Sequence, residues 1–396
     1  MALCVTVIVS YGVVFYAFTV LLPRIAADTG WSETAVTAAF SAGSVTGGLV
    51  GIVAGRVLQA RGPWPVMTSG SVVGTVAVLG LAWSPGYPVF FGAWVLAGVA
   101  SAGLFYAPAF AALTGWYGDR SVRAITTLTL AAGFSSTIFA PLTDALAAEL
   151  TWRQTYLVLA AVLLAVTLPL HAAVLRRPWP HRHGRWPPAA GTGEALRDRE
   201  ILRSRTFVLA TSAGTLMAFA TFASLVYLVP LLIDRGMSTT WAAWALGLGG
   251  AGQVAGRVFY PWMSRRLDAR TRAVLVISAM GLSLLALAVV TRPTAVVVGL
   301  AVLAGASRGL FTLVGATLVS DYWGRQRYAA ISGVYNAPVL AASALAPLLG
   351  AVIADLVGGY VGLYVVLAGT AGVAAILAAS VERAGSRDVD ASPVVG

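Results

Sequence analysis

Long runs of apolar residues restrict the possible folds of this chain more than any other feature of its sequence. A helix needs about 20 apolar residues to cross a hydrocarbon core of ~30 Å. Lipid offers no hydrogen-bond partners, so the backbone groups of each run must be satisfied within a helix. The sequence therefore predicts an all-α integral membrane protein with twelve transmembrane helices. The predicted helices are residues 1–22, 37–55, 66–84, 89–115, 124–148, 154–175, 206–233, 241–262, 273–291, 295–320, 329–354 and 362–380.

The composition agrees with this fold class and excludes several others. Hydrophobic residues make up 58% of the 396 residues and charged residues only 10%, whereas soluble domains carry about 25% charged residues. These values exclude an ordinary soluble enzyme, a disordered chain and a nucleic-acid-binding protein. One cysteine and three histidines offer no disulfide and no metal cluster, so we expect neither a metal site nor another cofactor. The sequence carries no nucleophile, nucleotide or metal motif, and we expect a protein that is not an enzyme.

All 26 basic residues are arginine, and they are distributed unevenly between the two sides of the predicted membrane. With the N-terminus inside, twenty arginines lie on the inner side, and only Arg24, Arg153, Arg235 and Arg292 lie on the outer side. Cytoplasmic loops carry an excess of basic residues, so both termini are predicted to be cytoplasmic. The use of Ala, Val, Gly and Arg without Lys is typical of a GC-rich bacterial genome. We therefore expect a multi-pass protein of a bacterial plasma membrane.

Residues 176–205 form the longest interruption between apolar runs. The segment is basic and proline-rich, as is typical of a linker, and a short amphipathic helix is predicted near Glu194–Arg203. We interpret His181 and His183 within it as residues of a solvated loop. The predicted organisation is a six-helix bundle over 1–175, a cytoplasmic central loop over 176–205, a second six-helix bundle over 206–380 and a cytoplasmic tail over 381–396.

The two halves of the chain repeat one another. Leu96–Phe105 reads LAGVASAGLF, and Leu303–Phe311 reads LAGASRGLF. Matches at a nearly constant offset across several predicted helices indicate an internal duplication. Repeated halves in a polytopic protein are typical of transporters whose solute site lies between the halves. The matched pairs that follow are Gly103 and Gly309, Gly118 and Gly324, Ile125 and Ile331, and Pro141 and Pro347.

Twelve predicted helices, a six-plus-six duplication and a central basic loop resemble the major facilitator superfamily over nearly the whole chain. The resemblance implies a fold of two pseudo-symmetric six-helix bundles that rock about a cavity at the middle of the membrane. It also implies that helices one, two, four, five, seven, eight, ten and eleven line this cavity. Glycines and prolines in those helices fit such movement, since small residues permit close approach and prolines permit bending.

The loop after the second predicted helix carries a variant of a family motif. The family pattern is close to G-x-x-x-D-R-x-G. Both glycines match, whereas Gln59 stands in place of Asp and Ala60 in place of Arg. In the family this Asp–Arg cluster fastens cytoplasmic helix ends together, so we expect the two flanking arginines to substitute for it only in part. The residues assigned to this gating motif are Gly55, Arg56, Gln59, Arg61 and Gly62.

Two arginines lie within predicted helices, Arg257 in the eighth and Arg308 near the middle of the tenth. A central arginine costs at least ~2.5–3.5 kcal/mol on insertion scales. Acidic partners are scarce, and Asp144 is the one carboxylate within a predicted helix far from the cytoplasmic side. Because guanidinium binds carboxylates in a bidentate manner, two such charges favour a site for an anionic solute. The alternatives are hydrogen bonds to helix carbonyls or a pair with Asp144.

The segment from Gln253 to Arg257 resembles the eighth helix of the monocarboxylate porter branch of the superfamily. There an arginine engages the substrate carboxylate, and Arg257 matches it. Four residues earlier that branch often carries an Asp tied to proton coupling, and Gln253 occupies this position. The spacing places both residues on one helix face. Since an amide does not titrate, the resemblance implies substrate binding without this route for protons.

Further polar groups in the predicted lining helices are candidates for solute contact. Tyrosine and asparagine side chains in such positions can orient a ligand. The alternative for each tyrosine is core packing or a place in the interfacial aromatic belt. The candidates are Tyr11, Tyr106, Tyr227, Tyr335 and Asn336, and the first predicted helix adds Tyr16 and Thr19.

These observations predict a monomeric secondary or facilitative transporter of a small organic anion, such as a monocarboxylate. The expected partners are the solute, the lipid bilayer, and protons or a counter-anion as the energy source. No nucleic acid is expected. The alternative is an efflux pump of the same fold for apolar drugs or antibiotics, which the aromatic-rich helices would suit. A membrane enzyme or receptor lacks the motifs that its chemistry would need.

Overall fold

The computed structural model describes residues 1–118, 121–179, 200–324 and 328–381, and every regular element in this part of the chain is helical. The first half contains α1 (Ala2–Tyr11), η1 (Gly12–Tyr16, a π-helical turn), α2 (Ala17–Thr29), α3 (Glu33–Arg61), α4 (Pro63–Ala82), α5 (Tyr87–Leu104), α6 (Tyr106–Tyr117), α7 (Ser121–Ala132), α8 (Ser135–Glu149) and α9 (Trp152–Val174). The second half contains α11 (Arg205–Asp234), α12 (Thr239–Arg266), α13 (Ala269–Val289), α14 (Thr294–Trp323), α15 (Tyr328–Val357) and α16 (Tyr360–Ala379).

The predicted twelve-helix fold is confirmed. Within the described residues, eleven helical spans are long and apolar enough to cross a membrane. The remaining predicted span, the eighth in chain order, is α12, a helix of 28 residues. Its five glycines, Gln253 and three arginines make it less apolar than the others. The predicted helix near Glu194–Arg203 and the tail after 381 fall largely or wholly outside the described residues.

Three of the spans consist of shorter helical pieces, and the sequence gives a reason for two of the breaks. The α5–α6 break lies at Phe105, because Pro108 lacks the N–H that would bond to the carbonyl of Leu104. The first span is interrupted by η1, where the ring of Phe139 occupies the space that a Cβ on Gly12 would need. Glycine at this position therefore permits the close contact of η1 with α8.

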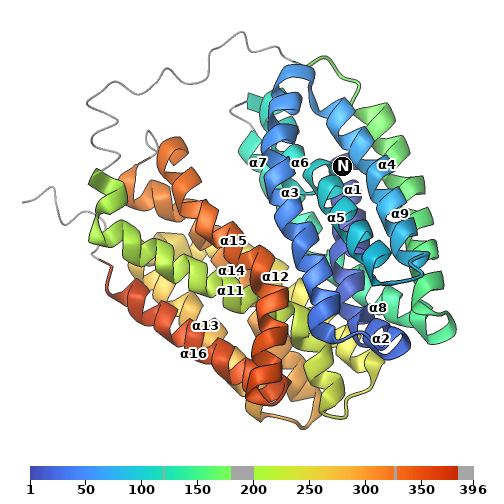
Figure 1. Cartoon of the computed structure of the whole chain (residues 1–396). Helices are drawn as coiled ribbons and strands as arrows, with labels where there is room; N and C mark the ends of the chain where they lie inside the picture. Colours follow the sequence, from blue (N-terminus) through green and yellow to red (C-terminus); the bar gives the residue numbers. More distant parts are fainter. Residues whose placement is uncertain (119–120, 180–199, 325–327, 382–396) are drawn as a thin grey trace, which may run out of the picture.

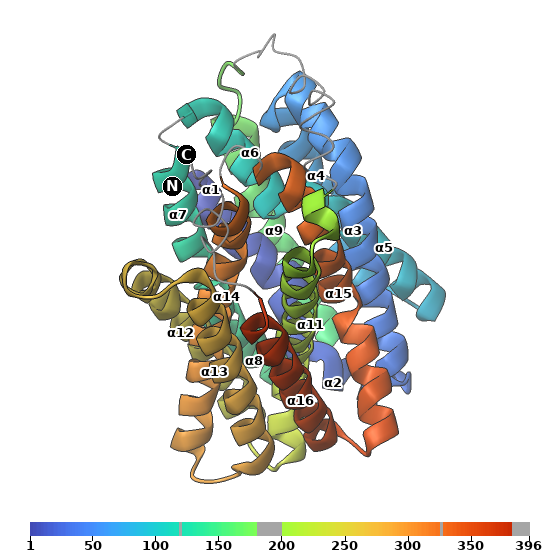
Figure 2. The same cartoon turned by 90° about the vertical axis from the view of Figure 1, so that its left-hand side faces the viewer.

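The helices pack mainly within their own half of the chain. In the first half, α4 packs against α5 and α9, and α3 against α5. In the second half, α13 packs against α14 and α16, and α11 against α15 and α16. Figures 1 and 2 show α1–α9 gathered in one body and α11–α16 in the other. The duplicated sequence thus folds into two bundles.

Equivalent glycine seams hold one helix pair together in each bundle. A Cβ on Gly98 of α5 would overlap the carbonyl oxygen of Gly43 on α3. In the second bundle, a Cβ on Gly305 of α14 would overlap the carbonyl oxygen of Gly249 on α12. Gly98 and Gly305 stand at matching places in the repeated LAG sequence. Both pairs therefore require glycine for the same close approach of two backbones.

The two ends of the helix array differ in charge. One end carries Met1 and the turns or helix ends at Arg61, Arg176 and Arg265, and we call it the arginine-rich end. The opposite end carries the turn at Gly236, and we call it the arginine-poor end. The same segregation of arginine predicts the orientation in the membrane.

The two bundles are joined at the arginine-poor end. Thr34, at the start of α3, donates a hydrogen bond to Asp355 near the end of α15 (2.7 Å). The Tyr360 hydroxyl donates to the Glu33 carboxylate. Further in, the backbone N–H of Leu348 donates to the Ser41 hydroxyl (3.1 Å). Figure 1 shows the helices of the two bundles diverging from here toward the arginine-rich end.

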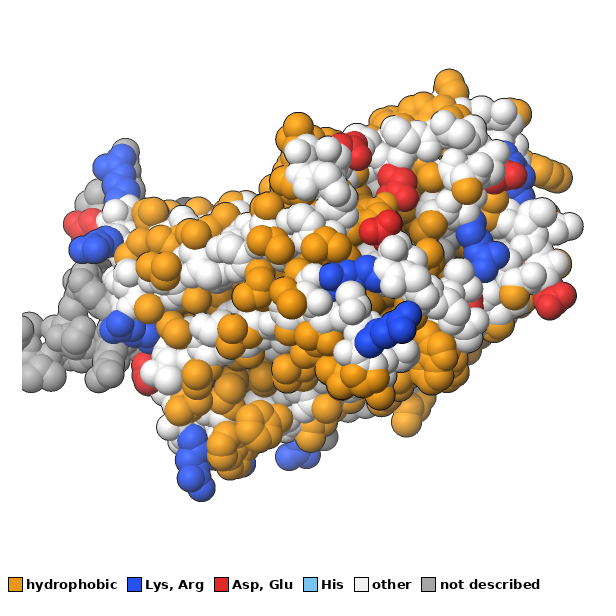
Figure 3. Space-filling model, turned by 90° about the horizontal axis from the view of Figure 1, so that it is seen from below, with side chains coloured by type: hydrophobic (Ala, Val, Ile, Leu, Met, Phe, Trp, Pro, Cys, Tyr) orange, Lys and Arg blue, Asp and Glu red, His pale blue; other side chains and the backbone are white. Residues whose placement is uncertain are grey.

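The outer surface of the bundles fits a lipid environment. Large apolar side chains on several helices are exposed, among them Leu49 of α3, Leu282 and Val289 of α13, and Ile376 of α16. In the view of Figure 3, hydrophobic side chains cover much of the surface and charged side chains are few. A soluble protein of this size would cover such faces with charged residues.

Candidate solute-binding site

Arg308 lies at the middle of α14, fourteen residues after Thr294 and fifteen before Trp323. Its Nε donates a hydrogen bond to Oε1 of Gln253 on α12 (2.7 Å). The backbones of the two helices touch here, because a Cβ on Gly309 would overlap the carbonyl oxygen of Gln253. Nη2 of Arg308 is buried and has no hydrogen-bond partner among the described residues. This edge of the guanidinium therefore carries N–H groups that have no acceptor in the part of the chain that the structure describes.

Arg257 lies one helical turn after Gln253 and is 6% exposed. Its Nη1 donates to the carbonyl oxygen of Thr129 on α7, in the other bundle. This carbonyl also accepts the N–H of Gly133, where the chain turns from α7 into α8. Nε of Arg257 is buried without a hydrogen-bond partner in the described part of the chain. The sequence left open that a mid-helix arginine bonds to a helix carbonyl. Arg257 forms such a bond, but only through Nη1.

Three tyrosines of the first bundle face these arginines. The ring of Tyr11 stacks on Phe105, with 4.1 Å between ring centroids, and lies 4.9 Å from that of Tyr106. Both tyrosines are within electrostatic range of Arg257. Tyr16, at the end of the π-helical turn η1, is within electrostatic range of Arg308. Single π-helical turns are frequent at functional sites.

The structure therefore brings together five of the eight residues proposed for solute binding: Arg257, Arg308, Gln253, Tyr11 and Tyr106. They come from both bundles and meet near the middle of the helices. Two guanidinium groups with free N–H groups and neighbouring phenol hydroxyls can bind a carboxylate through charge-assisted hydrogen bonds. Buried guanidinium groups without such a partner are destabilising.

Carboxylates are remote from this site. In the described residues, every carboxylate within a long helix except Asp144 lies within two residues of a helix end. Asp144 itself pairs with Arg24 of α2 (3.4 Å), and Arg24 also donates to the carbonyl of Ala147. The suggestion that Asp144 pairs with a mid-helix arginine is therefore wrong. Arg24 forms the pair with Asp144 because α2 extends to Thr29, which places Arg24 beside α8.

The other three residues proposed for solute binding lie elsewhere. The Tyr227 hydroxyl donates to the carbonyl of Pro347 (2.5 Å), and its ring stacks on Tyr360 near the arginine-poor end. Asn336 is exposed and donates to the carbonyl of Ser332 in its own helix (2.8 Å). Neither residue lies beside the two arginines. Tyr227 is thus a packing residue of the joined end, which is one of the alternatives that the sequence left open.

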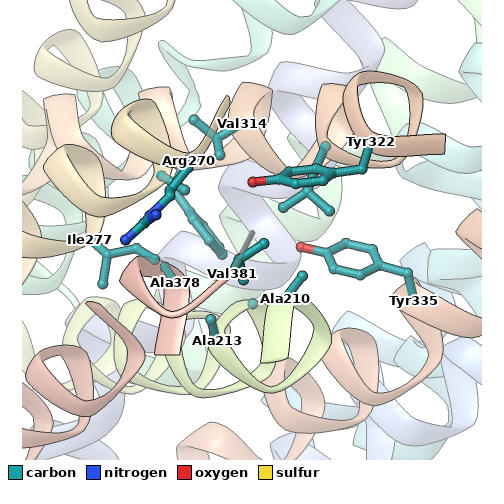
Figure 4. A pocket seen from close by; sticks show the side chains of 13 residues that line it. Ala210, Ala213, Arg270, Ile277, Val314, Tyr322, Tyr335, Ala378 and Val381 are labelled. Atoms are coloured by element: carbon teal, nitrogen blue, oxygen red, sulfur yellow. The ribbon is translucent and has the colours of Figure 1, made fainter. Parts of the chain in front are cut away.

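Tyr335 lines a separate small cavity within the second bundle. Figure 4 shows its hydroxyl and that of Tyr322 entering this cavity, with Arg270 across from them. Apolar side chains such as Ile277 and Val314 form most of its wall. The position toward the arginine-rich end separates it from Arg308, so Tyr335 does not belong to the same site.

The gating motif forms the end of a helix rather than a loop. α3 continues through Arg61, and the chain turns only at Gly62, whose φ of +82° favours glycine. The Trp179 ring covers Gly62, and its Nε1 donates to the carbonyl of Gln59 (3.2 Å). Trp179, in the segment after α9, thus contacts the end of the helix that carries the motif. The partial substitution of Arg56 and Arg61 for the family cluster stays a prediction.

Two contributors to the site were not predicted. The Thr129 carbonyl is a backbone group, and no side-chain pattern marks it. Phe105 was known only as part of the repeat, although it supports the ring of Tyr11. Pro108 is the sequence signal that could have identified Phe105, because a proline at this place predicts a helix break three residues earlier.

Among the described residues, no group of three or more His, Cys, Asp or Glu side chains lies close enough to hold a metal.

Comparison with known proteins agrees with the fold. A family model described as Major Facilitator Superfamily matches residues 3–303. The chain belongs to this superfamily. It is a multi-pass membrane protein, and the family supports its assignment as a membrane transporter of a small solute.

Solved structures of low sequence identity share the fold. A nucleoside transporter, NupG, is 13% identical, with 95% of this chain and 97% of that chain covered and a TM-score of 0.71. A D-xylose-proton symporter is 12% identical, with 95% and 96% covered and a TM-score of 0.72. A bacterial homologue of the human lysosomal transporter Spinster, inward-facing and unoccupied, is 16% identical, with 96% and 94% covered and a TM-score of 0.73.

One curated relative is similar over part of its length. A chloramphenicol resistance protein of Streptomyces lividans is 30% identical over 158 residues, which cover 39% of this chain and 38% of that protein. The match spans about two fifths of that relative. The names of these proteins cover several kinds of solute, so the solute of this chain has to be argued from its own site.

Proposed function

We propose that the chain transports a small organic anion, with a monocarboxylate as the leading candidate, by alternating access across a bacterial plasma membrane. The observation that carries the proposal is the pair Arg257 and Arg308. Both lie far from the helix ends, each has a buried nitrogen without a partner among the described residues, and carboxylates are remote. An anion can both accept hydrogen bonds from these groups and neutralise their charge, whereas a neutral solute leaves the charge uncompensated and a cationic solute is repelled.

The organisation proposed with this function follows the two bundles. Residues 1–175 and 206–380 act as the two moving bodies, 176–205 as the cytoplasmic connection and 381–396 as a cytoplasmic tail. The concentration of arginine at one end supports cytoplasmic placement of both termini. The solute site is complete within one chain, which supports a monomer as the working unit.

The experiment uses the purified full chain in liposomes with radiolabelled pyruvate and malonate as probes. Uptake is measured for the wild type, for Arg308→Gln and for Arg235→Gln as a matched control. Arg235 donates to the carbonyl of Leu287 (2.6 Å) within the second bundle and is remote from the site. We expect Arg308→Gln to lower pyruvate uptake at subsaturating concentration at least about tenfold, the effect of losing one charge-assisted contact. Equal uptake by all three forms overturns the proposal.

Drug efflux is the second candidate function, because the chloramphenicol resistance protein is similar to part of this chain. Aromatic residues at the site, such as Tyr11 stacked on Phe105, offer flat surfaces for an apolar ligand. Expression in a drug-susceptible bacterium separates the two. A raised inhibitory concentration of chloramphenicol that persists in Arg308→Gln, without pyruvate uptake in liposomes, favours efflux.

A further inference from the structure

We propose that this transporter is an anion exchanger, because Arg257 keeps the empty carrier from reorienting. The proposal rests on the proposed function and adds how transport is driven. An exchanger moves an anion out for each anion that enters and carries little net flux. The two arginines differ in one respect: the contact of Arg257 crosses between the bundles, and the contact of Arg308 does not.

The contact of Arg257 crosses between the bundles. Its Nη1 donates to the Thr129 carbonyl of α7, whereas Arg257 itself belongs to α12. It is one of a row of contacts between α12 and the end of α7, the turn at Gly133 and α8. Next in this row, a Cβ on Gly133 would touch Val254, and the Thr137 hydroxyl donates to the carbonyl of Gly247 (2.7 Å). Arg257 is the member nearest the arginine-rich end.

The contact of Arg308 stays within one bundle. Gln253 and Arg308 lie on α12 and α14, which the glycine seam holds together. When the bundles move relative to each other, this pair moves as a unit. Arg308 therefore keeps its partner in every state of the transport cycle.

Alternating access requires the bundles to separate along the row that includes Arg257. The Thr129 carbonyl is anchored by the turn at Gly133 in the first bundle, so Arg257 loses it when the row opens. Nε of Arg257 already lacks a partner within the described residues. Tyr106, whose side chain also bonds to Arg257, belongs to the first bundle as well. An empty carrier would then hold a buried guanidinium that has lost its acceptors across the bundles, which is strongly unfavourable. A bound carboxylate replaces the carbonyl, and so only the loaded carrier reorients readily.

No described side chain at this site could exchange a proton near neutral pH and so compensate for the missing anion. Guanidinium keeps its proton, and the amide of Gln253 does not titrate. The titratable groups that face Arg257 from the first bundle are the phenols of Tyr11 and Tyr106. Phenols are already protonated near neutral pH, so they take up no proton there. Among the described residues, Asp144 pairs with Arg24 and Asp321 with Arg272, so neither carboxylate is paired with Arg257 or Arg308.

The test measures uptake of labelled pyruvate into proteoliposomes that contain either unlabelled pyruvate or potassium chloride alone. Valinomycin and potassium on both sides remove any electrical limit on net flux. For the wild type we expect exchange to exceed net uptake at least about tenfold, since an unpaired buried charge opposes return of the empty carrier. Equal rates in the two kinds of vesicle overturn exchange while leaving anion transport standing. Absence of pyruvate and malonate uptake from both overturns the proposed anion substrate itself.

Variants separate the two arginines. Arg257→Gln removes the stranded charge, so we expect the ratio of exchange to net uptake to fall toward one even where total uptake drops. Arg308→Gln is expected to weaken pyruvate binding and to keep the ratio, since its contact does not cross between the bundles. Arg235→Gln, which removes carbonyl contacts inside the second bundle, is expected to keep both properties. An unchanged ratio in Arg257→Gln contradicts the proposal.

A labelling measurement covers the case in which Arg257→Gln carries no flux. Thr37 of α3 is 0% exposed and lies beside Tyr227 of the second bundle, near the joined arginine-poor end. Its replacement by cysteine in a Cys4→Ser background reports opening of that end to a membrane-impermeant maleimide. We expect pyruvate to accelerate labelling of the otherwise wild-type chain, and Arg257→Gln to label quickly without pyruvate. If pyruvate leaves the labelling rate of both forms unchanged, the proposal is overturned.

Discussion

Arg308 and Gln253 are joined by a hydrogen bond of 2.7 Å between α14 and α12, two helices that pack closely along a glycine seam. The amide oxygen of Gln253 accepts this bond without neutralising the guanidinium. A glutamine at this place therefore orients the charge and leaves it available to a solute. A carboxylate in the same position would compete with an anionic solute for Arg308.

The first prediction tests this competition through Gln253→Glu. The substitution keeps the side-chain length and converts the neutral acceptor into a charged partner for Arg308. We expect the apparent KM for pyruvate to rise at least about tenfold, since a charge-assisted pair must be broken for binding. Initial rates of uptake into pyruvate-loaded liposomes give the KM.

Gln253→Met is the control, since it removes the acceptor without adding charge. We expect it to transport pyruvate with a KM far closer to that of the wild type. If Gln253→Glu transports pyruvate with an unchanged KM, Arg308 does not bind the carboxylate.

The helices could be predicted almost completely from the sequence, because their cause is local. A run of apolar residues long enough for the bilayer must form a helix whatever lies around it. The observed helices are longer than the runs, as α3 shows by continuing to Arg61. α12 was predicted although it is less apolar than the rest, since the segregation of arginines requires a span there.

The candidate site could be predicted only in part, because its partners come from distant segments. Arg257 and Arg308 were identified by their charge within apolar runs. Tyr227 has the same side chain as Tyr11, and only the packing of the helices shows which of the two faces an arginine. The pairing of Asp144 with Arg24 depends on how α2 crosses α8, and periodicity carries no information on that crossing.

The second prediction concerns the pair Arg24 and Asp144, whose carboxylate side chain is only 6% exposed. Asp144→Asn removes the charge that Arg24 neutralises. We expect a loss of about 1–3 kcal/mol of stability, typical of a hydrogen bond to a charged group. The melting temperature of the purified protein in detergent measures the effect.

The same variant separates this pair from the solute site. We expect the KM for pyruvate to stay unchanged in Asp144→Asn, because the carboxylate contacts Arg24 rather than Arg257 or Arg308. Removal of both charges in Arg24→Gln/Asp144→Asn is expected to restore part of the lost stability. A large change in KM with unaltered melting would place Asp144 in the transport site and contradict the assignment.

The third prediction concerns the glycine seam of the second bundle. Gly305→Ala would drive a Cβ into the carbonyl oxygen of Gly249, and a backbone atom inside a helix cannot turn aside as a side chain can. We expect a loss of about 1–3 kcal/mol, the usual range for overpacking. A lower melting temperature and a smaller monodisperse fraction in size-exclusion chromatography report it.

Gly299→Ala in the same helix is the matched control, since a Cβ there meets nothing within 4 Å. Alanine favours a helix over glycine by up to about 1 kcal/mol, so this variant should be neutral or slightly stabilised. Equal melting of Gly305→Ala and Gly299→Ala would show that the two helices do not approach as closely as the seam requires.

The fourth prediction concerns the contacts that hold the bundles together at the arginine-poor end. Tyr360→Phe removes the hydroxyl that donates to Glu33, and Thr34→Ala removes the donor to Asp355. Both bonds cross between the bundles, so their loss favours states in which this end is open. A shift of about 1–2 kcal/mol, as expected for one or two such bonds, changes the open population roughly five- to thirtyfold.

Labelling of a cysteine at Thr37, in the Cys4→Ser background, measures this shift. The side chain is 0% exposed in the joined state, so the rate of reaction with an impermeant maleimide follows the open population. We expect faster labelling in Thr34→Ala/Tyr360→Phe than in the parent. Tyr322→Phe serves as control, because its hydroxyl enters the cavity toward the opposite end and does not cross between the bundles. If the control and the double variant label at the same rate, these two bonds do not hold the end closed.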